Sequence, residues 1–130
     1  MFEYHGWVTI HDGCSEEQDD NTLLSDSVKQ IRGAVDQLDV NGFGCRVELA
    51  ESNGLHHLTM HGHRNHSQQW PLELFETAGR IAKGSYGVLY IHNDEDIDFS
   101  NEFQTWVMTR GKVTKRTDQF LSPCIPTLEG

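Results

Sequence analysis

The run of residues from Gly84 to Val113, GSYGVLYIHNDEDIDFSNEFQTWVMTRGKV, sets the architecture of the second half of the chain. Two apolar segments within it, Val88–Ile91 and Phe103–Met108, are rich in β-branched and aromatic residues and are bounded by Gly, Asn and Asp. This composition is typical of β-strands. Because Val88–Ile91 is apolar at successive positions, we expect it to be a central strand of the sheet.

The connector between these two strands concentrates negative charge. Its acidic residues are Asp94, Glu95, Asp96, Asp98 and Glu102. Neighbouring carboxylates repel one another and each must stay solvated, so such a loop is costly to hold together. Two interpretations remain: a plain solvated turn, or a patch kept acidic because a basic partner docks on it. We expect the second, and place these residues in a binding surface.

The residues before this run predict a helix and a hairpin. Apolar residues recur at helical spacing up to about Ala82, which predicts a helix that Ser67 or a near neighbour caps. Its buried stripe is expected to contain Leu74, Phe75, Ala78, Ile81 and Ala82. Further upstream, Arg46–Leu49 and Leu55–His61 read as two strands. They are joined by Asn53-Gly54, which is a strong hairpin signal.

The first forty residues predict one strand and one helix. Phe2–Ile10 alternates between apolar and polar residues, as a half-buried strand does. After a polar loop over residues 13–20, apolar residues recur at spacings of four and three, which predicts an amphipathic helix. Its stripe consists of Leu24, Val28, Ile31, Val35 and Leu38.

The order strand, helix, strand, strand, helix, strand, strand predicts an α+β fold in a single domain, residues 1–130. We expect a mainly antiparallel sheet of about five strands, with both helices packed on one face. Beyond the last strand, Arg110-Gly111-Lys112 turns the chain into a short extension. The tail from Phe120 onward is partly apolar, so we expect it to lie on the body of the domain.

Composition narrows the possible functions. The chain has 130 residues and a formal net charge of −10. This negative charge disfavours direct nucleic-acid binding and favours a cationic partner. The alternative is that the charge has no such role, since many soluble proteins are simply acidic. Three widely spaced cysteines outside any CxxC motif indicate a reducing compartment. The opening residues do not resemble a signal peptide and no apolar run approaches a membrane span, so we expect a cytoplasmic protein.

Motifs for catalysis or metal binding are weak. The sequence contains no GxSxG, P-loop, HExxH or GxGxxG motif. Five of its eight histidines fall in one segment: His56, His57, His61, His63 and His66. On a strand, His57, His61 and His63 would share a face and could converge on zinc or copper. Because no cysteine or carboxylate is interleaved among these histidines, we expect a solvent-facing surface and no metal. Because the catalytic and cofactor motifs are missing, we expect no catalytic residues and no cofactor.

Two of the three tryptophans are candidate interface anchors, because tryptophan is common both in cores and at interfaces. Trp7 lies on the polar side of its strand, and Trp106 shares a side with Gln104 and Met108. We therefore expect a sheet face carrying Trp7 and Trp106 to be available to a partner. Cys124, between Pro123 and Ile125, is expected to be a small buried side chain.

Together these residues resemble a known family. The motifs that carry the resemblance are MFEYHGW at 1–7, NHS at 65–67, GSYGVLYIHNDED at 84–96, NEFQTWVMTRGK at 101–112 and FLSPCIP at 120–126. Their ordered set, which runs nearly end to end, resembles the immunity protein 7 family of bacterial polymorphic toxin systems. The resemblance implies a protein that neutralises a toxin domain encoded by an adjacent gene. It transfers no catalytic residues and no toxin-contact residues.

The sequence therefore predicts a non-enzymatic immunity protein that occludes a cognate, basic toxin domain stoichiometrically in the cytoplasm. The acidic connector, Trp7 and Trp106 are its predicted toxin-binding residues. Two alternatives from other classes stay open at this point. One is a metal-binding module that uses the His-rich strand, and the other is an enzyme that reverses the modification made by a toxin.

Overall fold

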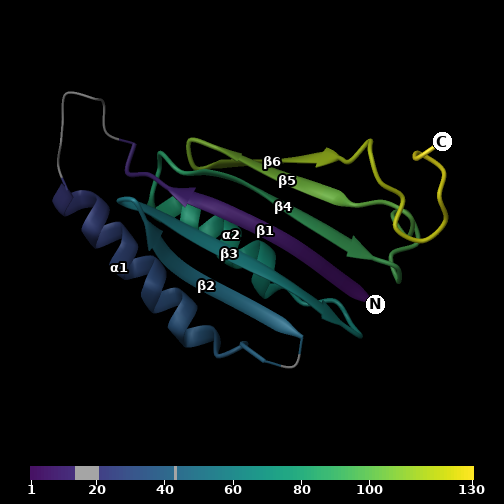
Figure 1. Ribbon diagram of the computed structural model, residues 1–130, viewed down its shortest axis with the longest axis horizontal. Helices are drawn as coiled ribbons and strands as arrows, with labels where there is room; N and C mark the ends of the chain where they lie inside the picture. The colour runs from purple at the N-terminus through teal and green to yellow at the C-terminus, as the bar shows by residue number, and fades with distance from the viewer. Residues whose placement is uncertain (14–20, 43) are drawn as a thin grey trace.

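The computed structural model describes residues 1–13, 21–42 and 44–130 (Figure 1). Within this described part the chain forms six strands and two helices. They are β1 (Phe2–Ile10), α1 (Asn21–Leu38), β2 (Cys45–Ser52), β3 (Leu55–Arg64), α2 (Trp70–Ile81), β4 (Tyr86–Asn93), β5 (Gln104–Thr109) and β6 (Lys112–Thr117). The predicted loop at 13–20 falls, apart from Gly13, outside the described residues.

All strands belong to one sheet in the order β2-β3-β1-β4-β5-β6, and every neighbouring pair is antiparallel. The predicted α+β class is confirmed, and β4 is an interior strand as expected. The sixth strand is β6, which the sequence suggested only as a short extension. Its six residues, KVTKRT, are mostly polar and exposed because β6 is an edge of the sheet.

Two tight hairpins fix the register of the sheet. Asn53 and Gly54 both have positive φ, 53° and 80°, which suits the two-residue turn between β2 and β3. Arg110 and Gly111 repeat this pattern between β5 and β6, with φ of 48° and 76°. The first hairpin is the one that the Asn-Gly signal predicts.

The sheet has a covered face and an open face. On β1 the side chains of Phe2, Tyr4, Val8 and Ile10 are buried on one side, while Trp7 on the opposite side is exposed. The core lies between the covered face and the two helices, which also contact each other. Figure 1 looks onto the open face, with α2 behind the sheet and α1 alongside β2.

Both helices bury the apolar stripes that their spacing predicts. On α1, Ile31 is fully buried and Val28 nearly so, while Leu24, Val35 and Leu38 are partly buried against the core. On α2 the buried residues include Leu74, Phe75 and Ala78. The helix begins at Trp70 rather than near Ser67, and Gln69 at its N-cap position makes no side-chain capping bond.

The tail lies on the body of the domain, but polar contacts hold it there. The side-chain oxygen of Asn101, Oδ1, accepts hydrogen bonds from the backbone N–H groups of Cys124 and Ile125, each at 2.8 Å. Ser122 bonds to the Glu129 carboxylate and ties the end of the tail into a loop. The side chains of Phe120 and Ile125 stay largely exposed, so the tail adds little to the core.

Candidate functional site

The acidic connector lies at the end of the sheet where the chain both begins and ends (Figure 1). The N-terminal ammonium group of Met1 donates a hydrogen bond to Asp94 Oδ1 at 2.7 Å. This hydrogen bond holds the pKa of the Asp94 carboxyl below its usual range. Glu95 lies 3.2 Å from the Nδ1 atom of His66. Two of the five connector carboxylates therefore lie beside a basic group of the protein itself.

The connector is a series of ordered turns rather than a featureless loop. Asn93 Oδ1 accepts a hydrogen bond from the N–H of Glu95 at 3.1 Å, and Asp96 Oδ1 accepts one from the N–H of Asp98 at 3.0 Å. Such side-chain-to-backbone bonds stabilise tight turns. Between Asp96 and Asp98, the side chain of Ile97 is 95% exposed. An exposed aliphatic side chain framed by carboxylates goes beyond what a turn requires.

A groove of about 420 Å³ runs between α2 and the connector. We call it the acidic groove, because its walls include three carboxylates, Glu73 and Glu76 of α2 and Asp96 of the connector, together with Trp106. The Nζ atom of Lys115 lies 5.2 Å from the centre of a ring of Trp106, a distance suited to a cation–π contact. The groove thus combines negative charge with an aromatic surface that already attracts a cation.

The two predicted tryptophan anchors lie on opposite faces of the sheet, so the expectation of one face carrying both is wrong. Trp7 is paired with Val88, whereas Trp106 is paired with Leu89. Because consecutive residues of a strand point to opposite sides, the two indoles cannot share a surface. Of the two, Trp106 joins the connector through Asp96 in the acidic groove.

The open face carries a second set of exposed aromatic residues. Trp7 is 43% exposed and packs edge-on to Tyr86 at 6.1 Å between ring centroids. Tyr90 lies on the same face, since it is paired with His5, two residues before Trp7. Aromatic residues are enriched at protein interfaces. The predicted alignment of His57, His61 and His63 on one face is confirmed by their pairing with Thr9, His5 and Glu3.

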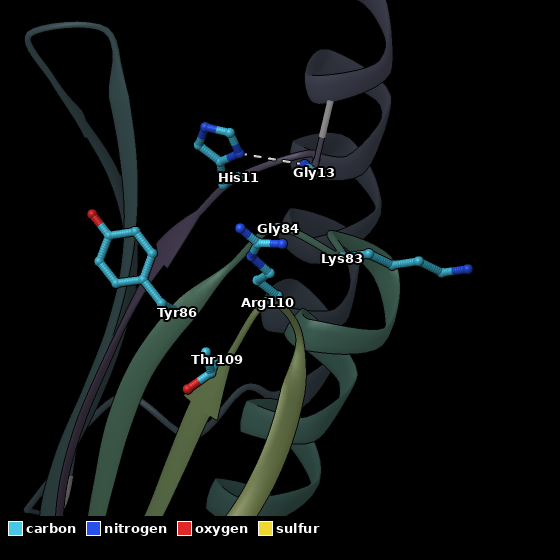
Figure 2. Close-up of a pocket in the computed structure, with 7 residues that line it drawn as sticks. All are labelled: His11, Gly13, Lys83, Gly84, Tyr86, Thr109 and Arg110. Atoms are coloured by element: carbon cyan, nitrogen blue, oxygen red, sulfur yellow. Dashed lines mark hydrogen bonds between the residues drawn. The ribbon is translucent and has the colours of Figure 1, made fainter. Parts of the chain in front are cut away.

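A wider hollow of about 650 Å³ lies at the other end of β1 (Figure 2). His11, Gly13, Lys83, Gly84, Tyr86, Thr109 and Arg110 line it. The backbones of Gly13 and Gly84 approach so closely that a Cβ on Gly84 would lie 2.3 Å from the Gly13 nitrogen. In Figure 2 the Lys83 side chain extends away from the hollow. The hollow contains a hydroxyl, on Thr109, and an imidazole, on His11, but His11 Nδ1 accepts its hydrogen bond from the Gly13 N–H at 3.3 Å and not from the hydroxyl, so the two do not form a nucleophile–base pair.

The one cysteine–histidine contact found among the described residues does not have the geometry of a catalytic pair. Cys124 Sγ lies 3.6 Å from His92 Nε2, and Cys124 is exposed, contrary to the expectation of a buried side chain. His92 Nε2 is also 2.8 Å from the Ser100 carbonyl oxygen. A carbonyl only accepts, so Nε2 carries the proton and cannot remove one from the thiol. The contact holds the tail in place.

Acidic and aromatic surfaces on a rigid sheet are features of a domain that binds another protein. The chain belongs to the immunity protein 7 family, whose model matches residues 1–130. This match confirms the resemblance and supports an immunity role. Comparisons with curated proteins and with solved structures gave no match. In the described part of the chain, no helix has the length and apolar character needed to cross a membrane.

Proposed function

We propose that this protein binds the toxin domain encoded by an adjacent gene and neutralises it by one-to-one occlusion in the cytoplasm. The observation that carries the proposal is the family match over the full 130 residues. The sites described above agree with it, because they offer binding surfaces rather than a nucleophile with an activated base. Occlusion requires only that a rigid surface cover the functional cleft of the toxin.

The acidic end of the molecule is the proposed toxin-binding surface. It consists of the connector carboxylates, Asp94, Glu95, Asp96, Asp98 and Glu102, and of the acidic groove with Trp106. Exposed Ile97 supplies an apolar contact, and the surrounding carboxylates attract a basic toxin. A net charge of −10 strengthens this attraction at long range. Association can then approach about 10⁸ M⁻¹s⁻¹ at low salt.

Trp7 belongs to a second candidate surface. With Tyr86 and Tyr90 it forms an exposed aromatic patch on the open face. The direct cross-strand neighbours of Trp7 are Thr59 and Val88, neither of which carries a charge. A basic partner is therefore drawn more strongly to the acidic end, and we assign Trp7 a supporting contact at most.

Co-purification of the protein with the toxin domain from the adjacent gene tests the proposal, with calorimetry to give the stoichiometry. We expect one-to-one binding, and full inhibition of the toxin only when the two are equimolar. A toxin domain from an unrelated gene pair serves as the control and should not bind. No binding at micromolar concentration would contradict the proposal. Protection at strongly substoichiometric amounts would instead indicate an enzyme that reverses the modification made by the toxin.

A further inference from the structure

The open face brings together two histidines and a carboxylate that are far apart in the sequence. Glu3 and His63 are direct cross-strand partners on β1 and β3, and His5 follows Glu3 on the same side of β1. The possible ligand atoms of these three side chains all lie within 4.8 Å of one another. Glu3 Oε2 is 2.5 Å from His5 Nε2 and 3.5 Å from His63 Nε2.

These distances are close to those of a tetrahedral metal site. Zinc–nitrogen and zinc–oxygen bonds of about 2.0–2.1 Å place neighbouring ligands about 3.4 Å apart. The separation of Glu3 from His63 already matches this value. The separation of Glu3 from His5 must widen by about 1 Å, which exposed side chains can do by small rotations. The His5 and His63 side chains are 47% and 57% exposed.

The backbone that carries the three side chains is well held. β1 is hydrogen-bonded on both sides, to β3 and to β4, so the positions of residues 3, 5 and 63 relative to one another are fixed by the ladder. Ligands on rigid strands lose little conformational entropy when they bind a metal. The backbone of the site is therefore preorganised, and only side-chain rotations remain to be fixed when a metal binds.

We propose that Glu3, His5 and His63 form a surface site for a divalent transition metal, with Zn²⁺ as the preferred ion. Imidazole nitrogens with one carboxylate suit zinc, whereas Mg²⁺ prefers oxygen ligands alone. Three protein ligands leave the fourth position to water. Because the ligands lie outside the core, the fold does not need the metal. The sequence predicts no metal site because no carboxylate is interleaved among the histidines; Glu3 supplies it from the neighbouring strand.

Zinc titration of the untagged, EDTA-treated protein by calorimetry tests this proposal independently of any toxin. We expect one equivalent of Zn²⁺ to bind, no binding of Mg²⁺ under the same conditions, and a higher melting temperature with saturating zinc. Glu3→Gln and His63→Gln should each weaken zinc binding at least about tenfold, since even loss of a residue that only orients a ligand costs about 10–100-fold. Cobalt substitution should give the visible absorption of a tetrahedral site.

His57→Gln is the matched control. His57 is on the same strand and the same face as His63, but it is paired with Thr9 at the other end of β1. This variant should bind zinc as the wild type does. Several equivalents of zinc, or equal losses in the His57 and His63 variants, would show diffuse binding to a histidine-rich surface and overturn the proposal. Absence of zinc binding at about 100 μM would overturn it as well. Circular dichroism establishes that each variant is folded.

Discussion

The covered and open faces of the sheet use the same strands for different purposes. On the covered face, side chains such as Tyr4, Leu58 and Leu89 are fully buried against the helices. On the open face the same strands carry Trp7, Tyr86 and a group of histidines. The apolar side chains of the covered face are needed to bury the core, so they maintain the fold. The exposed aromatic and histidine side chains of the open face are not required for folding, so they are available to bind a partner or an ion.

The largest difference between the faces should appear in stability. Ile31 of α1 is fully buried against the covered face, so Ile31→Ala should destabilise the protein by about 2–5 kcal/mol through lost burial and an unfilled cavity. Leu55→Ala is the control, because Leu55 is 48% exposed and its side chain is on the open face beside Ser52. Its effect should stay within about 0.5 kcal/mol. Urea unfolding measures both, and equal losses would contradict the two-face description.

The two tryptophans test which face binds the toxin. Trp106→Ala should weaken toxin binding by about 30-fold or more, since a buried aromatic anchor at an interface contributes about 2 kcal/mol or more. Trp7→Ala should change the affinity by less than about threefold, because it lies outside the acidic groove. Calorimetry with the toxin domain measures both.

A melting curve separates binding from folding in this comparison. Trp106 also packs against the core, so Trp106→Ala should lower the melting temperature somewhat, and Trp106→Phe keeps an aromatic ring for Lys115. If Trp7→Ala causes the larger loss of affinity, the open face is the main toxin-binding surface and the acidic end is secondary.

Removing charge from the connector should slow association. Asp94, Asp96 and Asp98, changed together to Asn, keep side-chain oxygens for the turn, so the fold should persist. Association should slow by about tenfold at low salt and by less at high salt, because screening already weakens steering. Stopped-flow rates at two ionic strengths measure this.

A second triple variant controls for net charge. Asp26 and Asp36 of α1 and Glu48 of β2 are exposed and lie outside the connector. Their change to Asn, Asn and Gln removes the same number of charges. Equal slowing in both variants would mean that the total charge matters and that the connector is only a solvated turn.

The fold could be predicted from the sequence wherever burial imposes a period. The α1 stripe around Ile31 and the alternation of β1 have the spacings that helices and half-buried strands require. β6 was not predicted as a full strand, because an edge strand with polar residues on both sides lacks the alternation of apolar and polar residues. The start of α2 could be predicted only to within a few residues of Ser67, because Gln69 at its N-cap makes no side-chain capping bond.

The candidate sites were less predictable, because they depend on which strands are neighbours. Each tryptophan can be assigned a side within its own strand, but only the register of β4 with β1 and β5 shows that Trp7 and Trp106 face opposite ways. The acidic groove likewise could not be predicted, because it forms only where α2 lies beside the connector in the folded protein. Glu3 meets His63 across a ladder that joins residues sixty positions apart. The only sequence signals for these sites were the acidic run and the density of histidines.

The smallest predicted effect concerns a residue of the covered face that does not follow the usual rule for cores. Tyr4 is fully buried, yet its hydroxyl has no hydrogen-bond partner within the usual geometry among the described residues; the Cys45 thiol, a weak partner, lies beside it. Burial raises the pKa of Tyr4 well above its usual range. Tyr4→Phe removes the poorly bonded hydroxyl and keeps the ring that packs edge-on to Trp70 at 5.3 Å.

Tyr4→Phe should therefore leave the free energy of unfolding unchanged or raise it by up to about 1 kcal/mol, because a buried unsatisfied hydroxyl costs about 1–3 kcal/mol.

Gly62→Ala supplies the complementary test, since a Cβ there would lie 2.5 Å from the Tyr4 hydroxyl oxygen. It should destabilise the wild type more than the Tyr4→Phe variant. The rescue should be partial, because the same Cβ would also lie 2.7 Å from the Gly44 carbonyl oxygen. A loss above about 1 kcal/mol for Tyr4→Phe alone would show that the hydroxyl is satisfied after all. The covered face would then contain a polar contact that contributes to stability alongside apolar burial.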